Sequence, residues 1–228
     1  MNRWYALALM IFLPLAALAQ VPAANYVEGV NYIRLPQVVR TADPKRIEVV
    51  EVFWYGCIHC FQLEPMVNDW RKTLLADVDF HHSPAIWQVS MVNPQTGNAE
   101  DTPHAIHAQA FYAAQALGVL ERIHMPFFTA LNVDRRTLLT EDQLAEFFGQ
   151  NGVKPEDFRK AFGSFGVQSS VKQAAARTRS YRIDGTPEMV VNGKYMISAR
   201  SAGGQAEMLK VVDFLVAKER AALAAGAQ

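Results

Sequence analysis

The chain has 228 residues, and half of them are hydrophobic, so it can bury one substantial core. Its 22 basic residues are balanced by 22 acidic residues. A chain with this balance has no overall field that attracts nucleic acid or an anionic membrane. We therefore expect a globular protein that does not bind nucleic acid.

Residues 1–19 have the pattern of a secretory leader. Arg3 precedes an apolar stretch that ends in Ala-Leu-Ala. A basic start, a hydrophobic middle and a small-residue end are typical of a cleaved signal peptide. The alternative, a membrane anchor, needs about 20 apolar residues, whereas this run is shorter and contains Pro14. We predict cleavage after Ala19 and export of the mature chain from the cytosol.

The first part of the mature chain reads as β-structure followed by a helix. Residues 20–46 predict an extended arm and a first edge strand. The β-branched and aromatic run over 47–54 predicts a buried central strand. Cys57 then begins a helical pattern, and residues 78–86 predict a second strand.

The middle of the chain is helical, and its end returns to β-structure. Helical patterns extend over about 102–182, with capping signals at Thr102-Pro103 and at 140–143. Two short strands joined by Asn192-Gly193 predict a β-hairpin, and a last amphipathic helix follows.

Two β-rich parts thus flank a block of helices. This order predicts an α/β protein with one discontinuous domain, 20–86 and 183–228, and an all-helical insertion domain over 100–182.

Cys57 and Cys60 are the only cysteines. A bridge between positions i and i+3 closes almost no loop, so we do not expect a structural staple. In an exported chain, a dithiol can instead persist in the oxidised form. This spacing, at a strand-to-helix turn, predicts a redox-active pair.

The start of a helix favours a thiolate at Cys57. The first turn has unpaired N–H groups and a partial positive charge. A thiolate that accepts the N–H groups of residues 59 and 60 has its pKa lowered from about 8.5 to roughly 3.5–7.5. We expect Cys57 to be the exposed attacking sulfur and Cys60 the buried resolving one. The imidazole of His59 should further favour the thiolate.

The other histidines are interpreted as ordinary surface side chains; they are His81, His82, His104, His107 and His124. Two of them lie three residues apart, but no third ligand is visible nearby. Zinc sites usually show two paired ligand clusters, and only one cysteine pair is present. We therefore expect no metal and no cofactor beyond the Cys57–Cys60 disulfide.

Thr186-Pro187 precedes the first strand of the hairpin. An X-Pro bond here can be cis and can leave a bare strand edge beside the dithiol. The local sequence alone favours an ordinary turn proline.

Two motifs together resemble the DsbA family of periplasmic thiol oxidases. They are Phe-Trp-Tyr-Gly-Cys-Ile-His-Cys over 53–60 and Gly-Thr-Pro-Glu-Met-Val-Val-Asn-Gly-Lys-Tyr over 185–195. The resemblance covers essentially all of the mature chain and implies a thioredoxin-like fold with an inserted all-helical domain. It also implies oxidation of free thiols in unfolded exported proteins, and reoxidation by an inner-membrane partner of the DsbB type.

The resemblance also implies roles for residues around the dithiol. Pro187 would be a cis-proline that faces the sulfurs, and Thr186 would tune the potential and contact substrate. Glu51 would be the buried acid under the active site; its alternative is a surface charge at a strand end. Ile58 departs from the family's usual proline, which leaves the redox potential open.

Two other functions compete with thiol oxidation. A disulfide isomerase or reductase uses the same chemistry but usually carries a dimerisation module, and we find none before the Cys57 strand, so we expect a monomer. A non-enzymatic chaperone would use apolar surface around Trp54, Tyr55 and Pro187. Replacing Cys57 would leave a chaperone active.

Overall fold

The computed structural model describes residues 26–87, 90–92 and 99–226, so the predicted leader over 1–19 lies outside the described residues. The strands are β1 (Ile33–Arg34), β2 (Ile47–Phe53), β3 (Val78–Pro84), β4 (Ser90–Val92), β5 (Ala99–Asp101), β6 (Glu188–Val191) and β7 (Tyr195–Ser198). The helices are α1 (Ile58–Trp70), η1 (Arg71–Thr73), α2 (Pro103–Ala116), α3 (Leu120–Asn132), α4 (Glu141–Gln150), α5 (Pro155–Phe162), α6 (Phe165–Ser180), α7 (Ala199–Ala202) and α8 (Gln205–Gly226).

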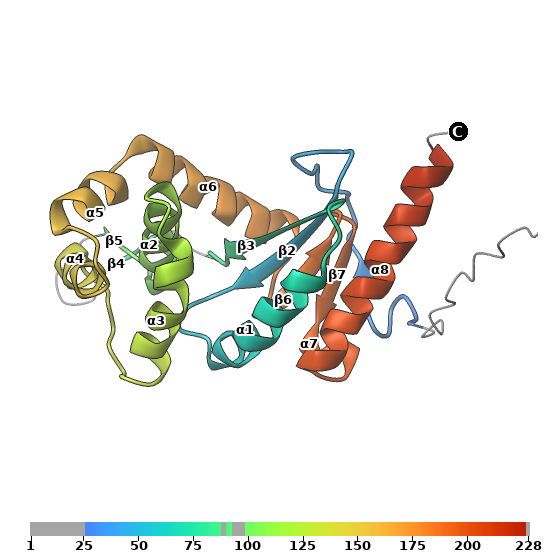
Figure 1. Cartoon of the computed structure of the whole chain (residues 1–228), viewed down its shortest axis with the longest axis horizontal. Coiled ribbons are helices and arrows are strands. Elements are labelled where there is room, and N and C mark those ends of the chain that lie inside the picture. The colour runs from blue at the N-terminus through green and yellow to red at the C-terminus, as the bar shows by residue number, and fades with distance from the viewer. Residues whose placement is uncertain (1–25, 88–89, 93–98, 227–228) are drawn as a thin grey trace, which may run out of the picture.

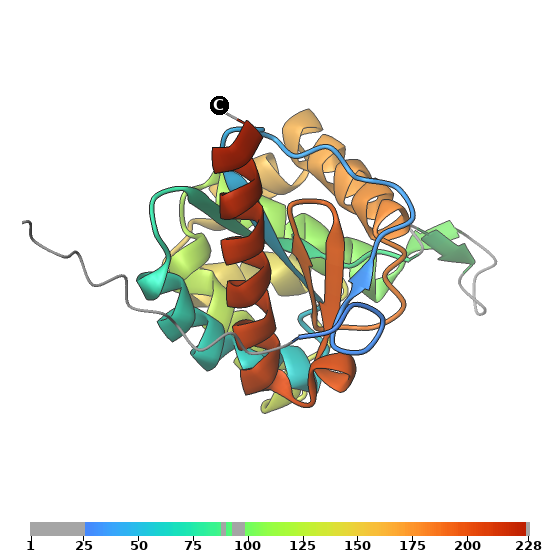
Figure 2. The same cartoon turned by 90° about the vertical axis from the view of Figure 1, so that its right-hand side faces the viewer.

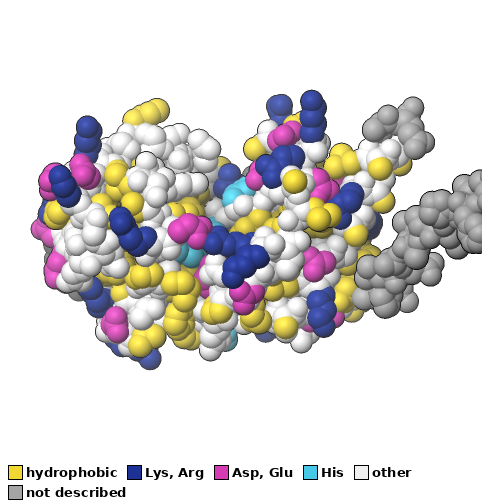
Figure 3. Space-filling view, viewed as in Figure 1, with side chains coloured by type: hydrophobic (Ala, Val, Ile, Leu, Met, Phe, Trp, Pro, Cys, Tyr) yellow, Lys and Arg dark blue, Asp and Glu magenta, His cyan; other side chains and the backbone are white. Residues whose placement is uncertain are grey.

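The helices α2 to α5 gather at one end of the molecule, and the main sheet with α1 and α8 forms the other end (Figure 1). Helix α6 extends from the helical end back towards the sheet. Viewed from the side, α8 crosses one face of the sheet (Figure 2). Acidic and basic side chains are interspersed over the face shown in Figure 3. Among the helices that the structure describes, none is long and apolar enough to cross a membrane.

The main sheet has the strand order β1-β7-β6-β2-β3. Strands β2 and β3 are parallel and are connected through α1, whereas β6 pairs antiparallel with β2 and with β7. All seven residues of β2 are buried, as a strand with neighbours on both sides requires. The segments before and after the helical block therefore build one sheet, and the predicted thioredoxin-like fold with inserted helices is confirmed.

Alternation along β2 sends its side chains to opposite faces of the sheet. Ile47 and Val49 pack against α1 and α8, while Val50 and Val52 pack against the end of α6. Glu51 shares the face of Ile47 and Val49, so this carboxyl group is buried on the side where α1 begins.

The turn between β6 and β7 has the geometry that its sequence predicts. Asn192 and Gly193 both have positive φ, 53° and 59°, as a type I′ hairpin turn requires. A Cβ at position 193 would also overlap the Val39 carbonyl oxygen, so glycine is needed here for space as well as for φ.

The helical block has its own aromatic core, and this core is continuous with the end of β2. Phe127, Phe148 and Phe158 are completely buried in one cluster that also contains Phe53 and Tyr55. The helix starts follow the predicted caps. At α4, the Thr140 side chain accepts a hydrogen bond from the Gln143 backbone N–H, and the Gln143 side chain accepts one from the Thr140 backbone N–H. This capping box contributes about 1 kcal/mol.

The Asn132 side chain donates a hydrogen bond to the Tyr55 carbonyl oxygen, at 2.8 Å, and so ties α3 to the turn before Cys57. Strands β4 and β5 form a small antiparallel pair just before α2, which the sequence analysis did not predict.

Candidate functional site

The two cysteines lie where β2 gives way to α1. Cys57 is the N-cap of α1, with extended backbone angles of φ −89° and ψ 113°. Both cysteines are free thiols in the structure; Cys57 is partly exposed, and Cys60 is buried. One sulfur is therefore accessible to a second molecule, and the other is shielded behind it.

The surroundings of the two sulfurs shift their pKa values in opposite directions. The pKa of Cys57 is lowered from 9.0 to about 5, chiefly because the Cys60 thiol donates a hydrogen bond to it. Thr186 and the backbone N–H groups of residues 59 and 60 lower it further, whereas burial of Cys57 acts to raise it. Burial and the neighbouring Cys57 raise the pKa of Cys60 well above its usual value. The two sulfurs thus differ in exposure and acidity in the direction that the sequence predicts.

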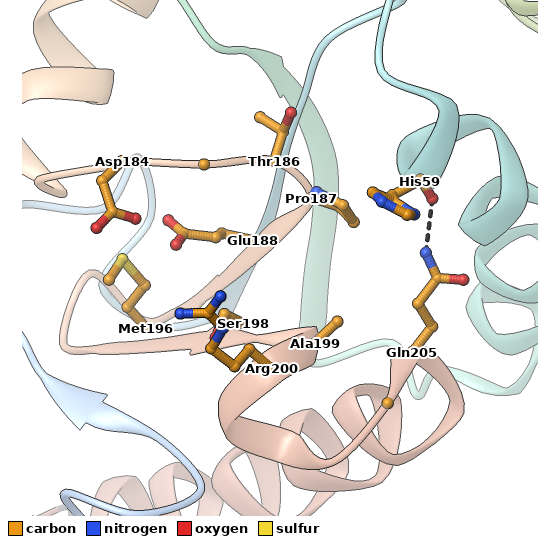
Figure 4. Close-up of a pocket in the computed structure, with 12 residues that line it drawn as sticks. His59, Asp184, Thr186, Pro187, Glu188, Met196, Ser198, Ala199, Arg200 and Gln205 are labelled. Carbon is orange, nitrogen blue, oxygen red and sulfur yellow. Dashed lines mark hydrogen bonds between the residues drawn. The ribbon is translucent and has the colours of Figure 1, made fainter. Parts of the chain in front are cut away.

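The segment Thr186-Pro187 lies against Cys57. The peptide bond between these two residues is cis, and Cys57 Sγ is 3.3 Å from the Thr186 carbonyl oxygen. Pro187 is buried, and in Figure 4 it points towards His59. The interpretation as an ordinary turn proline, which the local sequence favoured, is wrong; the cis bond implied by the resemblance is confirmed.

Ile58 and His59 occupy the exposed start of α1. Ile58 is 44% exposed, and the imidazole of His59 lies 3.4 Å from the Gln62 side chain. The His59 carbonyl accepts a hydrogen bond of 2.6 Å from Gln205 (Figure 4). The backbone N–H of His59 helps to lower the pKa of Cys57, while an added effect of its imidazole stays a prediction.

Glu51 lies under the dithiol and is completely buried, so its interpretation as a surface charge is wrong. It is paired across the parallel strands with His82, whose Nε2 is 3.2 Å from Glu51 Oε2. Burial raises the pKa of Glu51, although His82 opposes this effect. The charges of Glu51 and Cys60 also act on each other, because Glu51 contributes to the raised pKa of that thiol.

The interpretation of the other histidines as surface side chains is wrong for three of them. His107 is only 3% exposed and accepts a hydrogen bond from the Trp54 indole. His82 and His124 each have a side chain that is 8% exposed, and both approach Glu64 from different elements. The sequence analysis did not select Glu64. The alternation of Phe80 and His82 along β3 was the signal that could have placed this imidazole on the inner face.

A groove borders the dithiol on the side of Pro187. The cavity has a volume of about 770 Å³ and is lined by His59, Thr186, Pro187 and Gln205, among others. In Figure 4, Glu188 lies on the far side of Pro187 from His59, near Asp184. Thr186, whose carbonyl oxygen lies 3.3 Å from Cys57 Sγ, is part of this lining, so the cavity lies beside the exposed sulfur.

A thioredoxin-like sheet with a C-x-x-C dithiol at a helix start, faced by a cis-proline, defines a thiol:disulfide oxidoreductase. The family model of the DSBA-like thioredoxin domain matches residues 48–208. The chain belongs to this family.

Curated relatives and solved structures agree with this assignment. The Thiol:disulfide interchange protein DsbA of Azotobacter vinelandii is 41% identical over 194 residues, covering 85% of each chain. The protein of the same name from Pseudomonas aeruginosa is 37% identical over 204 residues, covering 88% of this chain and 89% of its own. The crystal structure of Pseudomonas aeruginosa DsbA superposes with a TM-score of 0.79 at 36% identity and covers 88% and 97% of the two chains. The chain is thus an enzyme that exchanges thiols and disulfides.

Proposed function

We propose that this enzyme oxidises cysteine pairs in exported, unfolded polypeptides by donating a Cys57–Cys60 disulfide. The observation that carries the proposal is the low pKa of Cys57, about 5. Stabilising the thiolate stabilises the reduced protein, and a protein with a stable reduced form has a strongly oxidising disulfide.

The exposure of the two sulfurs sets the order of steps. A substrate thiolate attacks Cys57 Sγ, the Cys57–Cys60 bond breaks, and a mixed disulfide forms while Cys60 leaves and takes up a proton. A second substrate thiolate then attacks the substrate sulfur of the mixed disulfide and expels Cys57 as a thiolate. The substrate loses two electrons, which the enzyme's cysteine pair gains. No cofactor besides this pair is needed.

The neighbours of Cys57 support binding of an extended substrate. Thr186, Pro187 and His59 line the groove beside Cys57, so they are the side chains that we expect to contact substrate. Ile58 is exposed at the same edge and would contact substrate as well as tune the potential.

Cellular context extends the proposal. We propose that the leader is cleaved after Ala19, that the enzyme acts as a monomer in the periplasm, and that a DsbB-type inner-membrane partner reoxidises it. Expression of the full chain in a Gram-negative host tests the first part. The periplasmic fraction should contain a protein whose measured mass matches that of a chain that begins at Gln20.

Substrate oxidation tests the function directly. The oxidised enzyme, mixed with a reduced unfolded protein that needs disulfides, should restore the activity of that protein, and Cys57→Ser should abolish the effect. Retained activity in Cys57→Ser would instead indicate a chaperone, whose predicted apolar surface is reduced here because Tyr55 and Pro187 are buried. The redox equilibrium with glutathione separates an oxidase from an isomerase or reductase, since a mild potential would favour the latter.

A further inference from the structure

A cluster of buried polar side chains lies beneath the dithiol and has no part in the exchange chemistry described above. It consists of Glu64 from α1, His82 from β3 and His124 from α3, and we refer to it as the Glu-His-His cluster. Their side chains are 1%, 8% and 8% exposed. One potential ligand atom from each residue lies within 4.8 Å of the other two.

The distances inside the Glu-His-His cluster suit atoms that share an ion better than atoms that share a proton. Glu64 Oε2 is 3.5 Å from His82 Nε2 and 3.4 Å from His124 Nε2. None of these three buried atoms makes a hydrogen bond. A charge-assisted N–H···O bond is about 2.7–2.9 Å long, whereas two ligands of one tetrahedral zinc ion lie about 3.3 Å apart.

Neighbouring groups orient two of the three side chains. His124 Nδ1 is 2.7 Å from the Tyr55 hydroxyl, and Glu64 Oε1 accepts a hydrogen bond of 3.0 Å from Asn68. When Nδ1–H donates to the Tyr55 oxygen, Nε2 of His124 directs its lone pair into the cluster. Metal-binding histidines and carboxylates characteristically have such outer partners, which fix the ring orientation and the tautomer.

The cluster also has space for a further ligand. A cavity of about 30 Å³ is lined by its three members together with Asn68 and Arg71, among others. This is close to the volume of one water molecule. Arg71 and Glu121 also line this cavity and form an ion pair of 2.6 Å that is partly exposed, so the cavity lies close to the surface.

Charge balance points in the same direction. Glu51 lies beside His82, so two buried carboxylates face two imidazoles in this part of the core. A divalent cation held by neutral imidazoles would balance both carboxylate charges. Buried charges in proteins are ordinarily paired with an opposite charge or coordinated to a metal ion.

From this geometry we propose that the protein binds one divalent transition-metal ion, of which zinc is the best match, through Glu64, His82 and His124. Two imidazoles and one carboxylate are a common ligand set for zinc with a fourth position open to water, and the nitrogen ligands disfavour calcium and magnesium. The sequence analysis expected no metal because these ligands come from three separate elements.

Zinc titration of the oxidised, untagged and metal-stripped protein tests the proposal. The disulfide prevents Cys57 and Cys60 from competing as thiolate ligands. Calorimetry should show one zinc ion per chain, and the melting temperature should rise when zinc is added. His82→Gln and His124→Gln should each weaken binding at least 100-fold, whereas His81→Gln, on the neighbouring position of β3, should bind like the unmodified protein.

Two milder variants keep the test informative if the ligand variants fail to fold. Tyr55→Phe removes the hydrogen-bond partner of His124, and Asn68→Ala removes that of Glu64, while all three ligands stay in place. Each variant should weaken zinc binding about 10–100-fold. The absence of zinc binding to the oxidised protein, or binding that survives His82→Gln and His124→Gln, would overturn the proposal. Thiol oxidation is measured separately with the metal-free enzyme, so failure of the zinc proposal and failure of the proposed oxidase function would be distinguishable.

Discussion

Acidification should remove the stability that the Cys57 thiolate gives to the reduced protein. The pKa of Cys57 falls from 9.0 to about 5 on folding. A group whose pKa is depressed in the folded state stabilises fully above its unfolded pKa, and the effect is lost as the pH falls through the folded value. The oxidised protein has no thiol to ionise. The difference in unfolding free energy between the two forms therefore isolates this effect.

The magnitude follows from the distance between the working pH and the folded pKa. At about pH 7 this distance is roughly two units, which corresponds to about 2.7 kcal/mol. Cys57 is partly exposed, so solvent screening should reduce the effect to about 1–2 kcal/mol. In a chain of this size, 1 kcal/mol shifts the melting temperature by about 2–4 °C. The reduced form should therefore lose about 2–8 °C relative to the oxidised form between pH 7 and pH 4.

Differential scanning calorimetry of both redox forms at the two pH values gives this difference directly. Any entropic effect of the short disulfide loop is the same at each pH and cancels from the change. Reduced Cys57→Ser serves as the control and should show the pH dependence of the oxidised protein. A gap between the redox forms that stays constant from pH 7 to pH 4 would refute the reasoning.

Three further outcomes are expected. The rate of Cys57 alkylation should follow a titration with its midpoint near pH 5, and His59→Ala should raise that midpoint by much less than the whole shift because the backbone N–H remains; a return to about 9.0 would contradict this. Cys60→Ser cannot form the Cys57–Cys60 disulfide, so it should fail to oxidise a reduced substrate, and oxidation at the rate of the unmodified enzyme would argue against this disulfide as the oxidant. Phe148→Ala should lower the free energy of unfolding by about 3–5 kcal/mol in urea titrations, whereas Phe165→Ala, at a position 86% exposed, should change it by less than about 0.5 kcal/mol.

The parts of the fold that could be predicted are those specified by neighbouring residues. The capping box at Thr140 fixed the start of α4, and Asn192-Gly193 fixed the hairpin turn. The position of the dithiol at a strand-to-helix turn could be predicted because the patterns of the strand and of the helix lie directly before and after Cys57 in the sequence. The difference between Cys57 and Cys60 followed from their positions in the first helical turn.

Features that depend on distant contacts were not predictable in the same way. His82 reads as an ordinary polar residue until the pairing of β2 with β3 places it beside Glu51. Glu64 and His124 join it only because α1 and α3 pack together. Pro187 has the local signature of a turn, and its cis bond was indicated by the resemblance rather than by its neighbours. The hairpin of β4 and β5 was missed because each strand has only three residues.

The hydrogen bond from Asn132 to the Tyr55 carbonyl has a consequence for engineering the protein. The turn that presents the reactive sulfur is held from the sheet side by β2 and from the helical side by α3. A shortened enzyme without the helices would expose Phe53 and Tyr55 and would lose the restraint on this turn. Transplanting the C-x-x-C loop into a smaller thioredoxin scaffold should therefore carry over the chemistry of the motif without its geometry. The unit that can be transplanted is the loop together with α3.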